Sequence, residues 1–237
     1  MLRSPVCRQV ALLLLAASAS LAAGAEALRV AVASNFRPVA EALAADLARS
    51  EGFESRISSA ASGVLAAQIR AGAPFDLFLA ADRQRPIALR AAGVGRGSAL
   101  CYARGRLVLL GADSVAALAD PKPSLAIANP RSAPYGKAAM AVLARPEFAP
   151  ALQRRLVRGA NVQQALQFFD SGAADLALVA RSLAADRGLL IPGDWHPPID
   201  QFALVLSDDA RATRWLAALR AEDYRATLER SGYEACP

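Results

Sequence analysis

Four short segments of the sequence place hydroxyl, amide or glycine residues where an apolar strand pattern gives way to a helix pattern. They are Ser34-Asn35 in VASNF, Ser62-Gly63 in AASG, Pro134-Tyr135-Gly136 in APYG and Asn161-Val162 in GANVQQ. Each supplies a side-chain donor or a free backbone N–H group at a helix start, where the helix dipole also favours negative charge. Such groups are suited to binding an oxyanion by hydrogen bonds alone, without a countercharge.

Each of these turns also has a simpler explanation, because Ser and Asn are among the commonest residues at helix N-caps. For Ser62 the two alternatives are a cap that stabilises the helix after it and a hydroxyl that donates to a bound anion. Two of the turns lie in the first half of the chain and two in the second. Two lobes facing each other would therefore aim all four at one cleft.

Strand and helix patterns alternate along the chain, which predicts mostly parallel sheets covered by helices on both faces. Ligands of such sheets bind beyond the carboxyl ends of the strands, which is where the four turns lie. Helices are expected between the strands, and one of them is predicted over 148–157. The segment 99–111 is longer than an ordinary strand and is expected to cross between two lobes. The predicted strands cover 28–34, 53–60, 75–81, 124–130, 174–182 and 201–207.

The first 27 residues have the pattern of a secretory signal peptide, with a basic start, the apolar run ALLLLAASASLAA and small residues after it. Cleavage is expected after Ala25 or Ala27, which makes the mature protein periplasmic. The net charge is +6, and aromatic residues make up 6% of the chain. Because the arginines are scattered and the aromatic residues are few, this composition indicates a solvated surface and no nucleic-acid partner.

Motifs for catalysis, nucleotides and metals are not found. His196 is the single histidine, and no G-x-S-x-G sequence accompanies it. Zinc would require several clustered ligands. The segment APYGK resembles part of a P-loop but lacks its first glycine and its final Ser or Thr. We expect no catalytic residue, no cofactor and no direct metal ligand, and the protein is predicted not to be an enzyme.

Longer blocks of the sequence resemble the periplasmic molybdate-binding proteins of bacterial ABC transporters. The resemblance covers nearly the whole mature chain in order, and QIRAGAPFDLFLAAD is its most specific part. It implies an α/β, two-lobed periplasmic-binding-protein fold of type II, with mixed, mostly parallel sheets and helices on both faces. The implied lobes are 28–103 plus 200–237 and 104–199. The blocks are VAVASNF, SSAASGVLAAQIRAGAPFDLFLAAD, ANPRSAPYGKAAMAVL, NVQQALQFFDSGAADLALVA and PPIDQFALVL.

The resemblance also implies a set of oxyanion-binding residues. Ser34 and Ser62 match the family's hydroxyl donors, and Asn35 matches a side-chain or backbone donor of one branch. Tyr135 and Val162 match positions that donate backbone N–H groups. The implied ligand is molybdate, and also tungstate, whose oxygens rather than metal would be contacted. The implied partner is an inner-membrane ABC permease, and the protein is expected to be a monomer.

Two other classes of function remain open at this point. One is a protein of the same fold that binds another anion, such as sulfate or an organic anion, and the other is a periplasmic enzyme or signalling subunit that reuses the fold. A binder of bulky charged ligands should carry Arg or Lys at the four turns, which these turns lack. Ala180 stands where some molybdate-binding members carry a tyrosine that contacts the ligand, so the resemblance is to the APYG branch.

Two cysteines, Cys101 and Cys236, remain once Cys7 is removed with the signal peptide. In the family that the chain resembles, the C-terminal helix packs on the first lobe, beside the start of the crossing segment. That placement implies a disulfide in the oxidising periplasm. The alternative is a buried thiol at Cys101 and a free thiol at Cys236.

Overall fold

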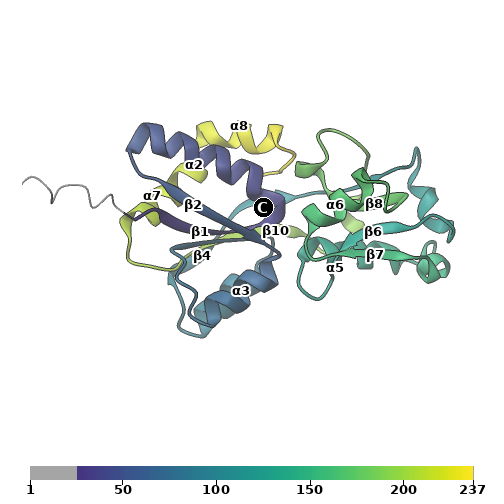
Figure 1. Ribbon diagram of the computed structural model, residues 1–237, viewed down its shortest axis with the longest axis horizontal. Helices are drawn as coiled ribbons and strands as arrows, with labels where there is room; N and C mark the ends of the chain where they lie inside the picture. The colour runs from purple at the N-terminus through teal and green to yellow at the C-terminus, as the bar shows by residue number, and fades with distance from the viewer. Residues whose placement is uncertain (1–25, 237) are drawn as a thin grey trace, which may run out of the picture.

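The computed structural model describes residues 26–236. The predicted signal peptide of residues 1–27 therefore lies almost wholly outside the described residues. Two five-stranded sheets, each with its own helices, form two lobes that follow one another along the longest axis of the molecule (Figure 1). Lobe 1 is the body built on the sheet β2-β1-β3-β10-β4, and lobe 2 is the body built on β7-β6-β8-β5-β9.

The sheet of lobe 1 is mixed. Its strand β1 pairs in parallel with β2 and β3, while β10 runs antiparallel to β3 and to β4. The parallel strands therefore end at the same edge, and the chain leaves that edge three times toward a helix. The bounds are β1 (Leu28–Ala33), β2 (Ser55–Ala60), β3 (Leu77–Ala80), β4 (Arg96–Gly105) and β10 (Ile199–Val205).

Lobe 2 repeats this arrangement. Strand β6 pairs in parallel with β7 and β8, while β5 runs antiparallel to β8 and to β9. The mixed, mostly parallel sheets expected from the sequence are confirmed, since in each sheet only one strand, β10 or β5, runs against the direction of the other four. The bounds are β5 (Leu107–Leu110), β6 (Leu125–Ala128), β7 (Leu156–Gly159), β8 (Leu176–Ala180) and β9 (Leu189–Leu190).

Helices cover the sheets of both lobes. In lobe 1, α2 and α8 lie on one side of the sheet and α3 on the other (Figure 1). The α-helices are α2 (Arg37–Glu51), α3 (Ser62–Arg70), α4 (Gln84–Ala91), α5 (Pro134–Leu143), α6 (Val162–Asp170), α7 (Ala210–Leu219) and α8 (Glu222–Arg230). Short 3-10 helices span Ser34–Phe36, Val115–Ala119, Ala149–Gln153, Arg181–Leu183 and Gly193–Trp195. Within residues 26–236, no helix is both long and apolar enough to cross a membrane.

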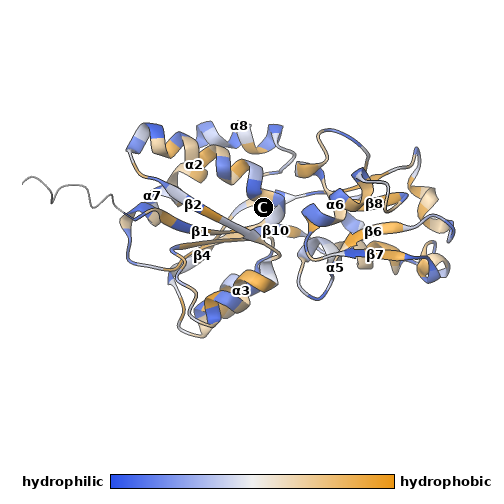
Figure 2. Ribbon diagram, in the orientation of Figure 1, coloured by the Kyte–Doolittle hydropathy of each residue, from blue (hydrophilic) through white to orange (hydrophobic). Residues whose placement is uncertain are grey.

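Burial of apolar side chains explains why these segments form. Strands β5, β6 and β8 are buried along their whole lengths, as continuous apolar runs between helices should be. Helix α2 buries Val39, Leu43 and Leu47, which recur every four residues along one face, and leaves polar residues outside. Figure 2 shows the same division, with apolar residues concentrated in the strands of lobe 2 and polar residues spread over α2 and α8.

The structure divides the single long strand predicted over 99–111. Strand β4 ends at Gly105 in the sheet of lobe 1, and β5 begins at Leu107 in the sheet of lobe 2. The chain returns between Leu190 and Ile199. The segment does run from one lobe to the other, but as two strands with different partners.

The helix predicted over 148–157 is wrong. Residues Ala149–Gln153 form a 3-10 helix, and the chain then becomes strand β7, which pairs with β6. The amphipathic pattern of this segment is short, and Pro150 lies within it, which limits a helix there. Pairing with the neighbouring strand satisfies backbone groups that a short, isolated helix would leave free.

Candidate functional site

The carboxyl ends of three strands of lobe 1 and the first residues of two helices of lobe 2 meet at one small cavity. The cavity is small, with a volume of about 10 Å³. All five residues predicted as oxyanion donors take part in its walls. The cavity is lined by Ala33, Ser34, Asn35, Ala61, Ser62, Ala81, Ala133, Pro134, Tyr135 and Val162.

Ser62 is not the helix cap that one of the two sequence interpretations offered. The cap position of α3 is Ala61, and the Ser62 hydroxyl makes no capping hydrogen bond. Its Oγ instead accepts a hydrogen bond of 2.9 Å from the backbone N–H of Ala81, at the end of β3. This bond uses the oxygen as an acceptor and leaves the hydroxyl proton free to donate. Ser62 is fully buried beside the cavity, so solvent cannot accept a hydrogen bond from that proton.

Ser34 and Asn35 open the 3-10 helix that follows β1, and both are buried. The Asn35 amide is already occupied, because its Nδ2 donates to Gln201 Oε1 at 2.9 Å and to the Tyr233 hydroxyl at 3.0 Å. Both amide protons are therefore used inside lobe 1. Of the two donors that the resemblance implied for this residue, the backbone N–H is the one that remains free.

The two helices of lobe 2 present backbone N–H groups to the cavity. The first N–H groups of an α-helix have no partner within the helix. In α5 the first residue is Pro134, which has no N–H, so Tyr135 carries the first donor. In α6 that donor belongs to Val162, the first residue of the helix. The side chain of the preceding Asn161 caps α6 by accepting a hydrogen bond of 3.0 Å from the Gln164 N–H group.

Local packing explains the PYG sequence at the start of α5. A Cβ atom on Gly136 would lie 2.2 Å from the carbonyl oxygen of Ala128, so only glycine lets the helix start this close to β6. The Tyr135 hydroxyl packs against Gly105. Burial, followed by the nearby Tyr233, raises the pKa of Tyr135 well above its ordinary value. The Tyr135 phenol is thus an uncharged packing group, and its backbone is the part suited to binding.

The ten residues that line the cavity include no charged side chain, no histidine and no cysteine. Among residues 26–236, no cluster of three or more His, Cys, Asp or Glu residues is placed to hold a metal ion. The polar character of the cavity comes from hydroxyls, backbone N–H groups and the N-terminal ends of helices. This donor set is suited to an anion and unsuited to a cation.

Hydrogen bonds between the lobes hold the cavity closed. Gly63 N–H in lobe 1 donates to the Ser132 carbonyl oxygen in lobe 2 at 2.9 Å. The Ser182 hydroxyl in lobe 2 donates to the Asn35 carbonyl oxygen in lobe 1 at 3.1 Å. Because the donors around the cavity are buried, an anion can enter it only if the lobes first separate.

Sequence reasoning missed the residues that support the site from behind, among them Gln201, Tyr233 and Ser182. Gln201 is fully buried in β10, and a glutamine at the start of the apolar run QFALV was the one signal that could have pointed to it. The contacts of Tyr233 and Ser182 with Asn35 span 198 and 147 residues. No local pattern carries such information.

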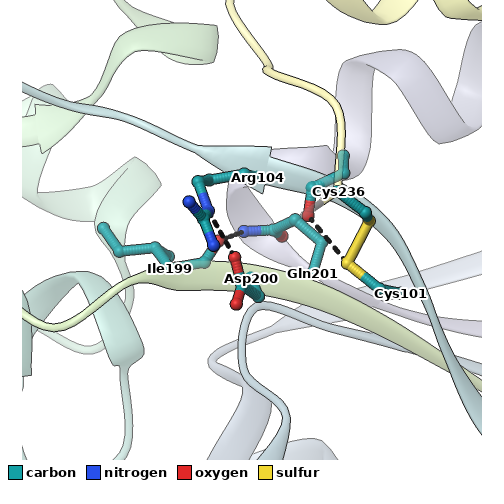
Figure 3. Close-up of a disulfide and its surroundings, with 7 residues drawn as sticks. Cys101, Arg104, Ile199, Asp200, Gln201 and Cys236 are labelled. Atoms are coloured by element: carbon teal, nitrogen blue, oxygen red, sulfur yellow. Dashed lines mark hydrogen bonds and ion pairs between the residues drawn. A yellow bond between two sulfur atoms is a disulfide. The ribbon is translucent and has the colours of Figure 1, made fainter. Parts of the chain in front are cut away.

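A disulfide joins Cys101 and Cys236 in the structure, as the resemblance implied. The Cα atoms of Cys101 and Cys236 lie 6.1 Å apart, and the two residues are separated by 135 positions. This Cα distance lies within the ordinary range of disulfides. The bond fastens the end of the chain to strand β4 (Figure 3).

Comparison with known proteins gives one consistent answer. The family model described as bacterial extracellular solute-binding protein matches residues 28–234. The molybdate-binding protein of Azotobacter vinelandii is 39% identical over 201 residues, covering 78% of this chain and 80% of that protein. The molybdate-binding protein of Rhodobacter capsulatus is 33% identical over 228 residues, covering 90% of each. The solved structure of the Azotobacter vinelandii periplasmic molybdate-binding protein matches with a TM-score of 0.82 at 33% identity, over 89% of this chain and all of that chain. The chain therefore belongs to the family of bacterial extracellular solute-binding proteins, together with these molybdate-binding relatives.

Proposed function

We propose that this protein binds molybdate, and also tungstate, between its two lobes and delivers the anion to an inner-membrane ABC permease. The observation that carries the proposal is the small closed cavity lined by uncharged donors from both lobes. The two relatives described above are named molybdate-binding proteins and match this chain along most of its length. The names of these relatives indicate the ligand, and the lining of the cavity provides hydrogen-bond donors suited to it.

Five residues would hold the anion in this proposal. Ser34 and Ser62 donate their hydroxyl protons, and Asn35, Tyr135 and Val162 donate backbone N–H groups. The anion then receives hydrogen bonds from both lobes, so its binding favours the closed arrangement over the open one. Hydrogen bonds to a charged group contribute about 1.5–3 kcal/mol each.

The same donor set explains the expected selectivity. Phosphate near neutral pH carries a proton and needs an acceptor, which backbone N–H groups do not provide. A fully deprotonated oxyanion meets donors on all sides. Sulfate is also fully deprotonated but smaller, so a rigid cage that fits molybdate leaves its hydrogen bonds to sulfate too long. Molybdate and tungstate have nearly the same size, and we expect both to bind.

The remaining parts of the proposal concern cell biology and assembly. The lobes in this proposal are 28–103 plus 200–237 and 104–199, and the strands of the lobe 1 sheet extend its bounds to Gly105 and back to Ile199. The protein acts as a monomer in the periplasm after cleavage of its signal peptide. It is not an enzyme. In support, the cavity walls include no histidine, cysteine or carboxylate that would act as a nucleophile or a base.

Calorimetric titration of the mature protein with molybdate, tungstate, sulfate and phosphate tests the proposal. Molybdate and tungstate should bind tightly and raise the melting temperature, because a ligand that binds only the folded state stabilises it by mass action. Sulfate and phosphate at equal concentration should do little. Equal binding of sulfate and molybdate would contradict the selectivity argument, and binding of none of the four would contradict the function.

A further inference from the structure

The last described residues, which follow α8, form a short tail that is fastened to lobe 1. The backbones of Glu234 and Arg104 exchange two hydrogen bonds, each 2.8 Å long, as in an antiparallel sheet. Two residues further on, Cys236 is bonded to Cys101 (Figure 3). We call residues 232–236 the C-terminal tail. Its attachment by a bridge and a disulfide places it on the β4 strand rather than in solvent.

The tail carries Tyr233, which reaches the residue behind the cavity. The Tyr233 hydroxyl donates to the Asn35 carbonyl oxygen at 2.8 Å and accepts from Asn35 Nδ2 at 3.0 Å. The ring packs edge-on against Phe36, with centroids 5.3 Å apart, and Tyr233 is only 3% exposed. Burial raises the pKa of Tyr233 well above its ordinary value, so the hydroxyl keeps the proton that it donates. One tail residue thus holds two different atoms of Asn35.

Gln201 completes the hold on Asn35. Its Oε1 accepts the second proton of Asn35 Nδ2 at 2.9 Å, while its own Nε2 donates to the Ile199 carbonyl at 2.9 Å. Both the side chain and the carbonyl group of Asn35 are therefore fixed. Because these two groups share the Cα atom with the backbone nitrogen, fixing them also restricts the direction of the Asn35 N–H group.

The tail also lies where the two lobes touch. The Asn35 carbonyl oxygen that accepts from Tyr233 accepts a second hydrogen bond from Ser182 of lobe 2. Gly232 sits against the same part of lobe 2, where an added Cβ atom would lie 3.0 Å from Arg181 Cγ. The tail therefore supports the contact that forms when the lobes close.

We propose that the disulfide-fastened C-terminal tail is part of the oxyanion site, with Tyr233 as a positioning residue that directs the Asn35 N–H group into the cavity. Tyr233 does not touch the anion. It acts through Asn35, and the bond between Cys101 and Cys236 keeps it in place. This inference rests on the proposed molybdate-binding function.

The test compares two tyrosine variants, each of which loses a hydroxyl that donates to a backbone carbonyl: that of Asn35, which lines the cavity, or that of Val39, which does not. Tyr233→Phe removes the contact with Asn35. Tyr224→Phe is the control, because the Tyr224 hydroxyl also donates to a backbone carbonyl, that of Val39, at 3.1 Å. Molybdate affinity is measured by calorimetry at a temperature where both variants are folded, beside the melting temperature of each without ligand.

We expect Tyr233→Phe to weaken molybdate binding about three- to ten-fold. The variant loses both hydrogen bonds to Asn35, but the anion feels this loss only through the single Asn35 N–H group, so the effect should be the size of one hydrogen bond between neutral groups. The affinity of Tyr224→Phe should stay within about two-fold of the wild type, although both variants melt earlier. A merely structural Tyr233 would lower the melting temperature and leave the affinity unchanged, and that result would overturn the inference. If the wild type itself binds no molybdate, the proposed function fails, which the unmodified protein shows directly.

A second variant decides the matter if Tyr233→Phe does not fold. Cys101→Ser with Cys236→Ser releases the end of the tail and leaves Tyr233 in the chain. We expect its molybdate affinity to fall at least about three-fold, because Tyr233 is then held against Asn35 only by the Glu234–Arg104 bridge and by its own contacts. Unchanged affinity in this double variant would overturn the role of the fastened tail.

Discussion

Gly63 offers a sharp test of closure, because it makes a very close contact between the lobes. It is the second residue of α3, and its N–H donates to the Ser132 carbonyl oxygen at 2.9 Å. A Cβ atom added to Gly63 would lie 2.8 Å from that same oxygen and 2.9 Å from Arg85 Nη2. The Arg85 side chain can shift, whereas the Ser132 oxygen belongs to the backbone of the other lobe.

The variant Gly63→Ala should therefore oppose closure without harming either lobe. Carbon and carbonyl oxygen rarely approach closer than about 3.3 Å, so the lobes would stop roughly 0.5 Å short of their present distance. Overpacking of this kind costs about 1–3 kcal/mol, which corresponds to roughly a 5- to 150-fold loss of molybdate affinity. In the open protein the Ser132 oxygen is remote, and alanine stabilises a helix by about 0.5–1 kcal/mol relative to glycine.

The assay needs two measurements on the same variant. Calorimetric titration gives the dissociation constant for molybdate, and differential scanning calorimetry gives the melting temperature without ligand. We expect weaker binding together with an unchanged or higher melting temperature. Gly193→Ala is the control, because an added Cβ atom there meets nothing within 4 Å. Wild-type affinity in Gly63→Ala would refute the closure argument, and a lower melting temperature without ligand would show that the strain lies within lobe 1.

Two further predictions concern single side chains. Ser62→Ala should weaken molybdate binding by about 1.5–3 kcal/mol, and it should also lower the melting temperature because the buried Ala81 N–H loses its acceptor. Replacing the exposed Ser50 by alanine is the control and should change neither quantity. Normal molybdate affinity in Ser62→Ala would show that this hydroxyl is not part of the site. Burial lowers the pKa of His196, so below pH about 6.5 the unfolded chain binds the proton more readily and the free energy of unfolding should fall as the pH drops. Urea unfolding from pH 7.5 to 5 measures this fall, and an equal slope in His196→Gln would assign it to other groups.

The sequence by itself determined the parts of this protein that rest on local pattern. The buried run of β1 and the amphipathic face of α2 follow from local sequence alone, since β1 is a short, nearly continuous apolar run and α2 repeats its apolar residues with the period of a helix. The turn residues at the ends of the strands pointed to the edge of the sheets where Ser34, Ser62 and Tyr135 do come together. Parallel strands end at a common edge in any fold of this class, so that inference needed no coordinates.

Only the tertiary structure decided which groups each side chain meets. The pattern over 99–111 has apolar residues on both sides of Arg104-Gly105-Arg106, and it cannot show that the sheet partners change there. A serine before a helix suits a cap as well as an acceptor for a distant N–H, and the folded chain assigned Ser62 to Ala81. Tyr233 lies 198 residues from the asparagine that it holds. Such pairings depend on how two lobes and a tail pack in space, because a hydrogen bond is made with the nearest suitable partner and not with a neighbour in sequence.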